Sequence, residues 1–437
     1  MVQAARRSAH SDLEAFETAL RHAVLAAGVT CLEEFMTAVG TRRRPQPVRC
    51  ACGALMQSRG VKPKQTLTLL GSAQYGRSMF QCPDCRAIRY PGDEALDMAG
   101  TSRSPGVRRQ TARLGAKEPF REVAKDLKEL AGIEMSRKDA ERTAETTGAD
   151  MERWDRAERD RLRHTPPPPS ESPKTIDTLY IEFDGTGVPM VPQEVAGRKG
   201  KQPDGSAKTR EAKLGCVFTQ TAFDDKGRPI RDPGATTFTG AIEPAAPFGW
   251  RIYAEAVRRG LFSAQCIIVL TDGAEWIKNI VETHFPGALH IIDLYHARQH
   301  LVDLCRLLFD RDIRTLNHYK DQWWDDLDEG NVEKIVEQAR NRLPKDPRAG
   351  TDARTAIGYF EKNKERMRYA RFKAQGTFVG SGVIEAGCKH VIGQRLKQSG
   401  MEWSVRGANA IIALRCIEGS NRTEDYWEQR AEQNPQI

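Results

Sequence analysis

The spacing of hydrophobic and polar positions divides the chain into a helical N-terminal part and a later part in which strands alternate with helices. Residues 11–40 carry apolar side chains at every third or fourth position, which predicts a pair of helices that pack on another element. Two strand-like runs between residues 65 and 81 predict a hairpin. Residues 119–144 predict two helices joined by a turn at Gly132, the pattern of a helix-turn-helix, although short helical hairpins are also common as purely structural units.

A polar helix over residues 147–163 then runs into a proline-rich stretch, whose extended geometry predicts a semi-rigid linker. The following part begins with a buried strand in Leu179–Met190, which ends at Asp184 in a Gly-rich turn. The elements expected after it are strands at 212–220 and 236–242, a helix at 248–261, a strand at 265–271 that ends in Asp272-Gly273, and a strand at 289–292 that runs into a helix.

Residues 297–375 are helical in pattern and highly charged, and the stretch Gly380–Glu385 opens a further long helix. The predicted divisions are an N-terminal helical segment (1–45), a cysteine-bearing ribbon (46–100), a helix-turn-helix-like region (101–163), a linker (164–176) and an α/β core (177–437) with an all-α insertion (297–375).

Composition indicates a soluble globular protein, and its charge suggests a partner. The chain has 437 residues, 39% hydrophobic and 29% charged, with a net charge of +8. A clustered basic excess, as in Arg42–Arg44, favours nucleic acid as a partner, and a solvated basic surface without a ligand is the alternative. No run approaches the roughly 18 apolar residues of a membrane span, and no secretory signal is recognised. We therefore expect a cytoplasmic protein without a membrane partner.

Ten cysteines in a reducing compartment are not expected to form disulfides. Two close pairs flank the predicted hairpin, and two such pairs at hairpin tips are typical of a zinc ribbon, because tetrahedral Zn²⁺ prefers four soft ligands. The predicted structural zinc ligands are Cys50, Cys52, Cys82 and Cys85. The alternative is four unrelated buried cysteines, since the first pair has one intervening residue instead of the usual two.

Three acids stand in comparable places. Asp184 and Asp272 each follow a strand, and Glu385 lies in a helix after the last strand. The order strand-strand-strand-helix-strand-helix-strand is that of an RNase H-like mixed sheet, in which the first and fourth strands are neighbours and the final helix crosses them. Three carboxylates there hold two Mg²⁺ (or Mn²⁺) ions for phosphoryl displacement. The acids are separated by 272 − 184 = 88 and 385 − 272 = 113 residues, and the helical insertion accounts for the longer interval.

Neighbouring polar residues compete for these roles. Glu182 shares a strand face with Asp184 and is a second candidate carboxylate, further from the strand end. Asp293, His296 and His300 form either a separate metal site or a structural group in which a histidine caps or packs under the sheet.

Basic residues outside the acids predict contacts with DNA phosphates, and Lys389, one helical turn after Glu385, is expected to lie near the metals. Trp403 is a candidate for base stacking, with a core position as the alternative. The predicted DNA-binding residues are Arg137, Lys138, Arg142, Arg198, Lys199, Lys201 and Arg395.

The chain carries four motifs in order: Ile181–Met190, Val269–Trp276, Asp293–His296 and Gly380–His390. Together with the later Lys397–Ser404, they resemble bacterial insertion-sequence transposases of the ISKra type, which are Mutator-related DDE transposases, and the resemblance covers most of the chain. It implies that the three acids bind the catalytic metals, and that the Asp-x-x-His motif lies near them and orients the acids or a phosphate.

The acids and the resemblance together predict a DNA transposase. Water attacks the phosphodiester at the transposon end, and the freed 3′-hydroxyl then attacks target DNA at the same two-metal site. The ribbon and the helical hairpin would grip transposon ends in a homo-oligomer, at least a dimer, on the bacterial nucleoid, with no small-molecule substrate. The alternatives are a structure-specific nuclease of the same fold and a domesticated DNA-binding regulator without catalysis.

Overall fold

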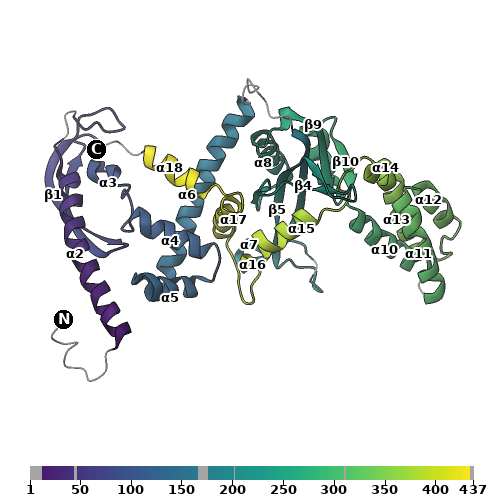
Figure 1. The fold of residues 1–437 in the computed structure, drawn as a ribbon, viewed down its shortest axis with the longest axis horizontal. Helices are drawn as coiled ribbons and strands as arrows, with labels where there is room; N and C mark the ends of the chain where they lie inside the picture. Colours follow the sequence, from purple (N-terminus) through teal and green to yellow (C-terminus); the bar gives the residue numbers. More distant parts are fainter. Residues whose placement is uncertain (1–11, 44–46, 166–175, 201, 310–311, 434–437) are drawn as a thin grey trace. The chain divides into compact units, whose positions relative to one another are not determined.

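The computed structural model describes residues 12–43, 47–165, 176–200, 202–309 and 312–433 (Figure 1). Two compact units form: unit 1 comprises Met1–Met151 with Arg422–Ile437, and unit 2 comprises Glu152–Asn421. The division falls at residues 151 and 152, inside a helix, upstream of the proline-rich linker predicted from the sequence. Residues 166–175 of that linker lie outside the described residues.

Unit 1 begins with one 29-residue helix, α2 (Leu13–Thr41), where the pattern predicted a pair. Its C-terminal end packs closely on a strand, because a side chain on Gly40 would meet the carbonyl oxygen of Gly76. Contrary to the expectation from the sequence, α2 is long and apolar enough to cross a membrane by length and composition, with an 18-residue window of mean hydropathy 1.4 that is 17% buried.

The predicted hairpin is confirmed as a three-stranded antiparallel sheet. Its elements are β1 (Gln57–Thr68), β2 (Gly71–Gln81) and β3 (Ile88–Arg89), followed by the short helix α3 (Pro91–Ala95). The hairpin turns tightly, since Thr68 pairs with Gly71, and Gly71 has a φ of +132° that favours glycine. The two strands bring the segments before β1 and after β2 to the same end of the sheet.

Three helices follow in unit 1: α4 (Pro105–Gly115), α5 (Phe120–Ala131) and α6 (Arg137–His164). Gly132 ends α5 in the left-handed conformation, and Ser136 Oγ accepts the backbone N–H of Asp139, as expected of a helix cap. The two helices predicted over 135–163 are one continuous helix, in which the Thr147 hydroxyl donates to the carbonyl oxygen of Thr143. The C-terminal helix α18 (Thr423–Gln433) also belongs to this unit.

Unit 2 is built on a mixed five-stranded sheet with the order β10-β9-β4-β5-β8. The strands are β4 (Ile176–Pro189), β5 (Thr209–Gln220), β8 (Thr237–Ala241), β9 (Ala264–Thr271) and β10 (Leu289–Ile292). β4, β9 and β10 run parallel, whereas β5 is antiparallel to both β4 and β8. The short helix α7 (Pro192–Val195) and the two-stranded ribbon of β6 (Ala222–Phe223) and β7 (Pro229–Ile230) lie in the connections.

Helices cover both faces of this sheet (Figure 1). On one face, α8 (Ala245–Arg258) and α9 (Glu275–His284) bury Phe183 and Phe248 in a large apolar core. On the other face, α15 (Gly382–Gly387) approaches so closely that a side chain on Gly387 would meet the ring of Phe238. The helix continues as a π-helical segment (Cys388–Gly393) and α16 (Gln394–Leu396), and α17 (Val405–Gly419) packs beside them.

The predicted insertion is confirmed as helical and lies beside the β10 edge of the sheet (Figure 1). Its helices are α10 (Leu294–Phe309), α11 (Ile313–Glu329), α12 (Val332–Arg340), α13 (Pro347–Asn363) and α14 (Tyr369–Ala374). Trp323 of α11 and Phe360 of α13 are fully buried.

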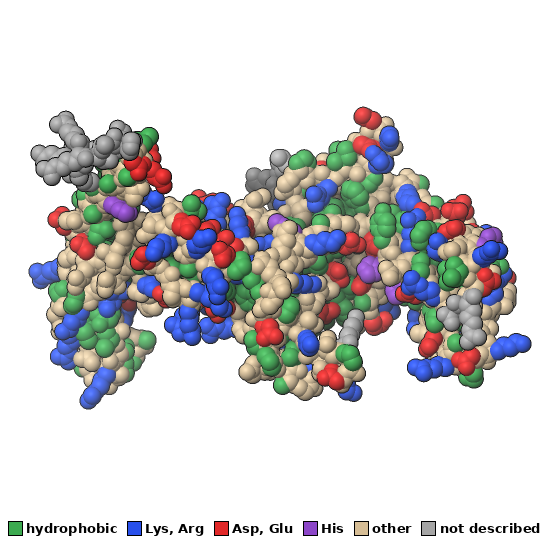
Figure 2. All heavy atoms as spheres, turned by 90° about the horizontal axis from the view of Figure 1, so that it is seen from below, with side chains coloured by type: hydrophobic (Ala, Val, Ile, Leu, Met, Phe, Trp, Pro, Cys, Tyr) green, Lys and Arg blue, Asp and Glu red, His purple; other side chains and the backbone are tan. Residues whose placement is uncertain are grey.

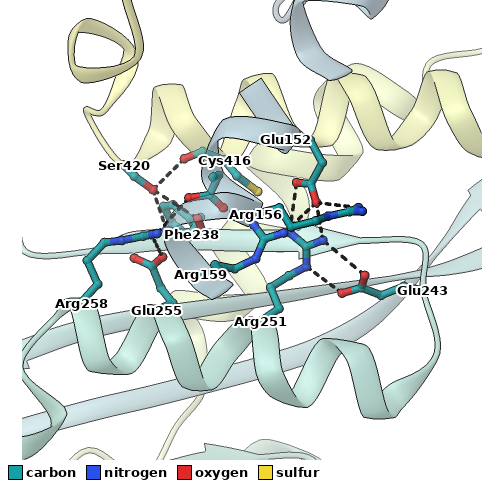
Figure 3. A network of polar contacts seen from close by, with 11 residues as sticks. Glu152, Arg156, Arg159, Phe238, Glu243, Arg251, Glu255, Arg258, Cys416 and Ser420 are labelled. Atoms are coloured by element: carbon teal, nitrogen blue, oxygen red, sulfur yellow. Dashed lines mark hydrogen bonds and ion pairs between the residues drawn. The ribbon is translucent and has the colours of Figure 1, made fainter. Parts of the chain in front are cut away.

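The C-terminal half of α6 is joined to α8 by a buried network of ion pairs (Figure 3). Arg251, 5% exposed, binds Glu152 at 2.8 Å and Glu243 at 2.7 Å. Arg258 binds Asp155 at 3.0 Å. Although burial alone would raise it, the neighbouring arginines hold the pKa of Glu152 below its ordinary value. Residues 152–164 are therefore a structural part of unit 2.

Candidate functional site

The four predicted cysteines come together at one end of the unit 1 sheet. Their sulfur atoms all lie within 4.8 Å of one another, with Cys50 3.4 Å from Cys85 and Cys52 3.6 Å from Cys82. Each pair sits on a tight turn: Gly53 N–H donates to the carbonyl of Cys50, and Arg86 N–H donates to that of Cys82. Both Gly53 and Arg86 have positive φ, so the chain folds back over its cysteines.

This cysteine cluster has the geometry of a structural zinc site. A tetrahedral ion with bonds of about 2.3 Å separates its sulfur ligands by about 3.8 Å, close to the observed distances. The backbone N–H groups of Cys85 and Asp84 lower the pKa of Cys82 to about 7. Although backbone N–H groups also act on Cys52 and Cys85, hydrogen bonds with the neighbouring thiols raise the pKa values of these two. The cluster can hold a metal ion, and its four soft donors fit Zn²⁺.

Asp184 and Asp272 lie at the same level on neighbouring parallel strands. β4 and β9 pair with a constant offset of 88 residues, as in Glu182 with Leu270, and the two aspartates are also 88 residues apart. They therefore stand at the same level, just beyond the residues that pair β4 with β9. Asp272 follows the end of β9, but β4 continues past Asp184 to Pro189, paired with β5, so the prediction that the strand ends at Asp184 in a Gly-rich turn is wrong. Burial, together with the negative charge of Asp272, raises the pKa of Asp184 above its ordinary value.

Asp293 occupies the next place along this edge, because β10 pairs with β9 so that Ile292 lies opposite Thr271. Its side chain is fully buried, and both oxygens accept backbone N–H groups: Oδ1 from His296 at 2.6 Å and Oδ2 from Ser381 at 2.5 Å. Asp293 thus caps α10 and ties it to the segment before α15. It does not form the metal group with His296 and His300 that was an alternative from the sequence.

Glu385 reaches the sheet through α15, which contacts β4 and β5. Glu182 is fully buried on β4, two residues before Asp184, and it accepts the N–H of Ile384 at 2.8 Å. This hydrogen bond holds Ile384, the residue before Glu385, against β4. Burial raises the pKa of Glu182 to about 8. We call Asp184, Asp272 and Glu385 the acid edge. Among the described residues, the four cysteines have ligand atoms that all lie within 4.8 Å of one another. The carboxylate oxygens of the acid edge do not all lie within this distance of one another.

Some residues around the acid edge carry no signal in the sequence. Tyr359, from α13 of the insertion, lies with its hydroxyl 3.4 Å from the carbonyl oxygen of Asp272, and its ring is 4.0 Å from that of His300. Burial, with the charge of His296, lowers the pKa of His300. Helical spacing alone does not predict which strand end Tyr359 and the insertion touch.

The helix after Glu385 departs from α-helical geometry. In the π-helical segment, the carbonyl oxygens of His390 and Val391 accept the guanidinium of Arg415 from α17. Lys389 is exposed, as a phosphate contact requires. Arg395 is fully buried with its guanidinium over the ring of Trp403, so the prediction that it contacts DNA does not fit its position. Trp403 is a core residue, 6% exposed.

The other predicted DNA-binding residues lie on the surface where described. Arg137, Lys138 and Arg142 are exposed in the first turns of α6, and Lys and Arg side chains are numerous over α4–α6 on the face in Figure 2. Arg198 and Lys199 are exposed in the loop between α7 and β5. Lys201 lies outside the described residues.

The chain resembles a protein family and solved structures. Residues 249–431 match the Uncharacterised protein family (UPF0236), a match that spans less than half of the chain and includes Asp272 and Glu385 but not Asp184. No curated protein matches the chain. Among solved structures, it is similar to the Drosophila P element transposase strand transfer complex, with 9% identity over 74% of this chain and 80% of that chain, at a TM-score of 0.23.

Proposed function

We propose that the chain is a metal-dependent DNA transposase of the DDE type, with an RNase H-like catalytic core in unit 2. The observation that carries the proposal is the shared 88-residue offset, which puts Asp184 and Asp272 at the same level, just beyond the residues that pair the parallel strands β4 and β9. The strand order β10-β9-β4-β5-β8, with β5 antiparallel to its neighbours, supports an RNase H-like core. The motifs that resemble ISKra-type transposases support the reaction class.

The donors of the acid edge fit Mg²⁺ or Mn²⁺, which prefer oxygen ligands. Asp184 and Asp272 each use Oδ1 to accept a backbone N–H, from Gly185 and Ala274, which leaves Oδ2 for a cation. Two ions bound there would stabilise the attacking and leaving oxygens of a phosphoryl displacement. Lys389, exposed on the helix after Glu385, binds a neighbouring DNA phosphate.

The remaining parts supply binding. The ribbon, stabilised by Zn²⁺ in the cysteine cluster, and the exposed basic turns of α6 grip transposon ends, and the net charge of +8 adds affinity for target DNA. A homo-oligomer handles the two ends together, on the bacterial nucleoid.

A strand-transfer assay tests the proposal, with DNA that carries the ends of the element, MgCl₂ and the full-length protein. Wild type is expected to cleave and join, and Asp272→Asn to lose about a thousandfold or more of both activities, because the ligand charge is removed. The matched control is Asp303→Asn, an exposed aspartate on α10. Full activity of Asp272→Asn would contradict the acid edge, cleavage without joining would favour the nuclease, and wild-type binding without cleavage would favour the regulator.

A further inference from the structure

The segment Gly376–Ile384, which leads from the helical insertion to Glu385, is held by side chains of the sheet. The Phe378 N–H donates to Tyr180 Oη at 3.1 Å, and Gln220 Nε2 donates to the carbonyl oxygen of Gly376 at 3.3 Å. At the end of the segment, Asp293 accepts the Ser381 N–H and Glu182 accepts the Ile384 N–H. The course of the segment is therefore set by polar groups of β4, β5 and the end of β10.

The last two of these bonds lie in the interior. Glu182 and Asp293 are both 0% exposed, and Ser381 and Ile384 are buried as well. A buried N–H that loses its acceptor cannot be compensated by water, so these two carboxylates hold the backbone on each side of Gly382 and Val383. Glu385 follows directly.

We propose that Glu182 and Asp293 are positioning residues, which hold the first turn of α15 so that Glu385 joins the acid edge, and that neither is a metal ligand. This inference rests on the proposed function of the acid edge. It resolves the roles that the sequence left open for both residues: Glu182 acts through Ile384, and Asp293 acts through Ser381.

Glu182, like Asp184, accepts a backbone N–H through one oxygen only, so an amide substitution is what distinguishes a positioning carboxylate from a ligand. Glu182 needs one acceptor for Ile384, through Oε2, while its Oε1 has no hydrogen-bond partner among the described residues. A glutamine keeps an amide oxygen for Ile384 and puts its amide nitrogen where Oε1 was, but it lacks the charge of a metal ligand. A conservative amide at 182 should thus preserve function, whereas the same change at Asp184 should abolish it.

The experiment compares Glu182→Gln, Glu182→Leu, Asp293→Ala and Asp184→Asn in the full chain, with the exposed Asp321→Ala on α11 as control. We expect Glu182→Gln to keep cleavage within about fivefold, and Glu182→Leu and Asp293→Ala to lose about a hundredfold in turnover, because a catalytic group is misplaced by about 1 Å. The affinity for Mn²⁺, measured by calorimetry, should decrease by no more than about threefold in Glu182→Gln and by much more in Asp184→Asn.

Amide hydrogen exchange supplies a readout that does not depend on activity. The Ile384 amide should exchange at least about tenfold faster in Glu182→Leu, and the Ser381 amide in Asp293→Ala, with little change in Asp321→Ala. Unchanged exchange at these amides would overturn the proposal. So would a folded Glu182→Gln that is as inactive as Asp184→Asn, since that result would make Glu182 a ligand.

Two further outcomes distinguish a failure of this inference from a failure of the proposed function. If Glu182→Leu does not fold, Glu182→Gln retains the acceptor and keeps the comparison with Asp184→Asn decisive. If wild type cleaves no DNA and binds no Mn²⁺, the proposed function fails, and the exchange of Ser381 and Ile384 then decides whether the two carboxylates hold the turn.

Discussion

The cysteine cluster and the acid edge are both predicted from residue spacing, but they are assembled in opposite ways. The cysteine cluster closes over 35 residues with a two-stranded hairpin between its halves. The apolar group around it is small: buried Met56 and the cysteines Cys50 and Cys82, with partly buried Val48, Ala54 and Phe80 packed against them. The acid edge joins residues from 184 to 385 on a sheet with a large apolar core on one face and helices on the other.

This difference indicates which part of each site supplies stability. A ribbon with a small apolar group would depend on a bound metal for folding, whereas a sheet with an extensive core would hold its carboxylates in place whether or not a cation is bound. Removing a metal ligand should therefore unfold the first site. In the second site, the damaging changes should be those that alter packing or buried charge.

The largest effect is expected for Cys82→Ser. Structural zinc contributes on the order of 10–16 kcal/mol in small metal-dependent domains, so this variant should lose its bound zinc and the protection of the ribbon, while unit 2 unfolds at an unchanged urea concentration. Zinc content by elemental analysis and limited proteolysis within residues 50–89 provide the measurements. The control is Cys31→Ser, an exposed cysteine on α2. If Cys82→Ser retains one zinc ion per chain, the ribbon does not depend on all four cysteines, and the difference proposed between the two sites is wrong.

The second effect concerns the buried network that joins α6 to α8. Arg251→Met leaves the partly buried carboxylates of Glu152 and Glu243 without their partner, and breaking a buried ion pair in this way costs about 3–5 kcal/mol. Urea unfolding of unit 2 should report a loss of that size.

Arg161→Met is the matched control, because the Arg161–Glu158 pair is on the surface, where solvent screens the interaction. Equal effects of the two changes would show that the network does not contribute to the stability of unit 2.

The sequence predicts those features that depend on local patterns. Apolar runs that end in Asp-Gly predict β4 and β9, and the close cysteine pairs predict the cluster, because each pattern is contained within a few neighbouring residues. The division of the chain is different: prolines indicate a linker after residue 163, but ion pairs to α8 assign residues from 152 onwards to unit 2. Pairing between distant charged residues leaves no periodic signal.

The same reason explains what was missed around the acid edge. Arginine is usually a surface residue, so the sequence predicts that Arg395 contacts DNA. The structure shows instead that Arg395 is buried, with its guanidinium over the ring of Trp403. The roles of Glu182 and Asp293 depend on backbone N–H groups 202 and 88 residues away along the chain. Spacing identifies candidate carboxylates, but long-range contacts decide which of them are free to bind a ligand.

A third effect tests whether packing controls the acid edge. Gly387→Ala adds a methyl group that would lie 2.8 Å from the ring of Phe238, so α15 must shift, at a cost of about 1–3 kcal/mol. DNA cleavage should decrease as well, since Glu385 lies on the same helix. Gly382→Ala is the control, because its methyl group meets nothing within 4 Å and its φ is not positive. If both variants unfold like wild type, the close approach of α15 to the sheet is not required.

The smallest effect is a pH dependence next to the acid edge. On β10, His290 lies 2.9 Å through Nε2 from Thr271 Oγ1, and burial, with the charge of Arg366, lowers the pKa of His290 to about 3. Because the unfolded chain takes up this proton near pH 6.5, the stabilising contribution is complete above that pH and declines as the pH falls towards 3. The free energy of unfolding should thus fall by about 1 kcal/mol between pH 6.5 and 5.5 through this group.

His290→Gln keeps a polar group for Thr271 and does not titrate, so its unfolding free energy should depend less on pH over this range, whereas His22→Gln, an exposed position on α2, should follow wild type. Urea unfolding at the two pH values measures the difference. If His290→Gln keeps the wild-type slope, a charged imidazolium is tolerated beside β9, and the strand end that bears Asp272 is more accessible to water than its packing implies.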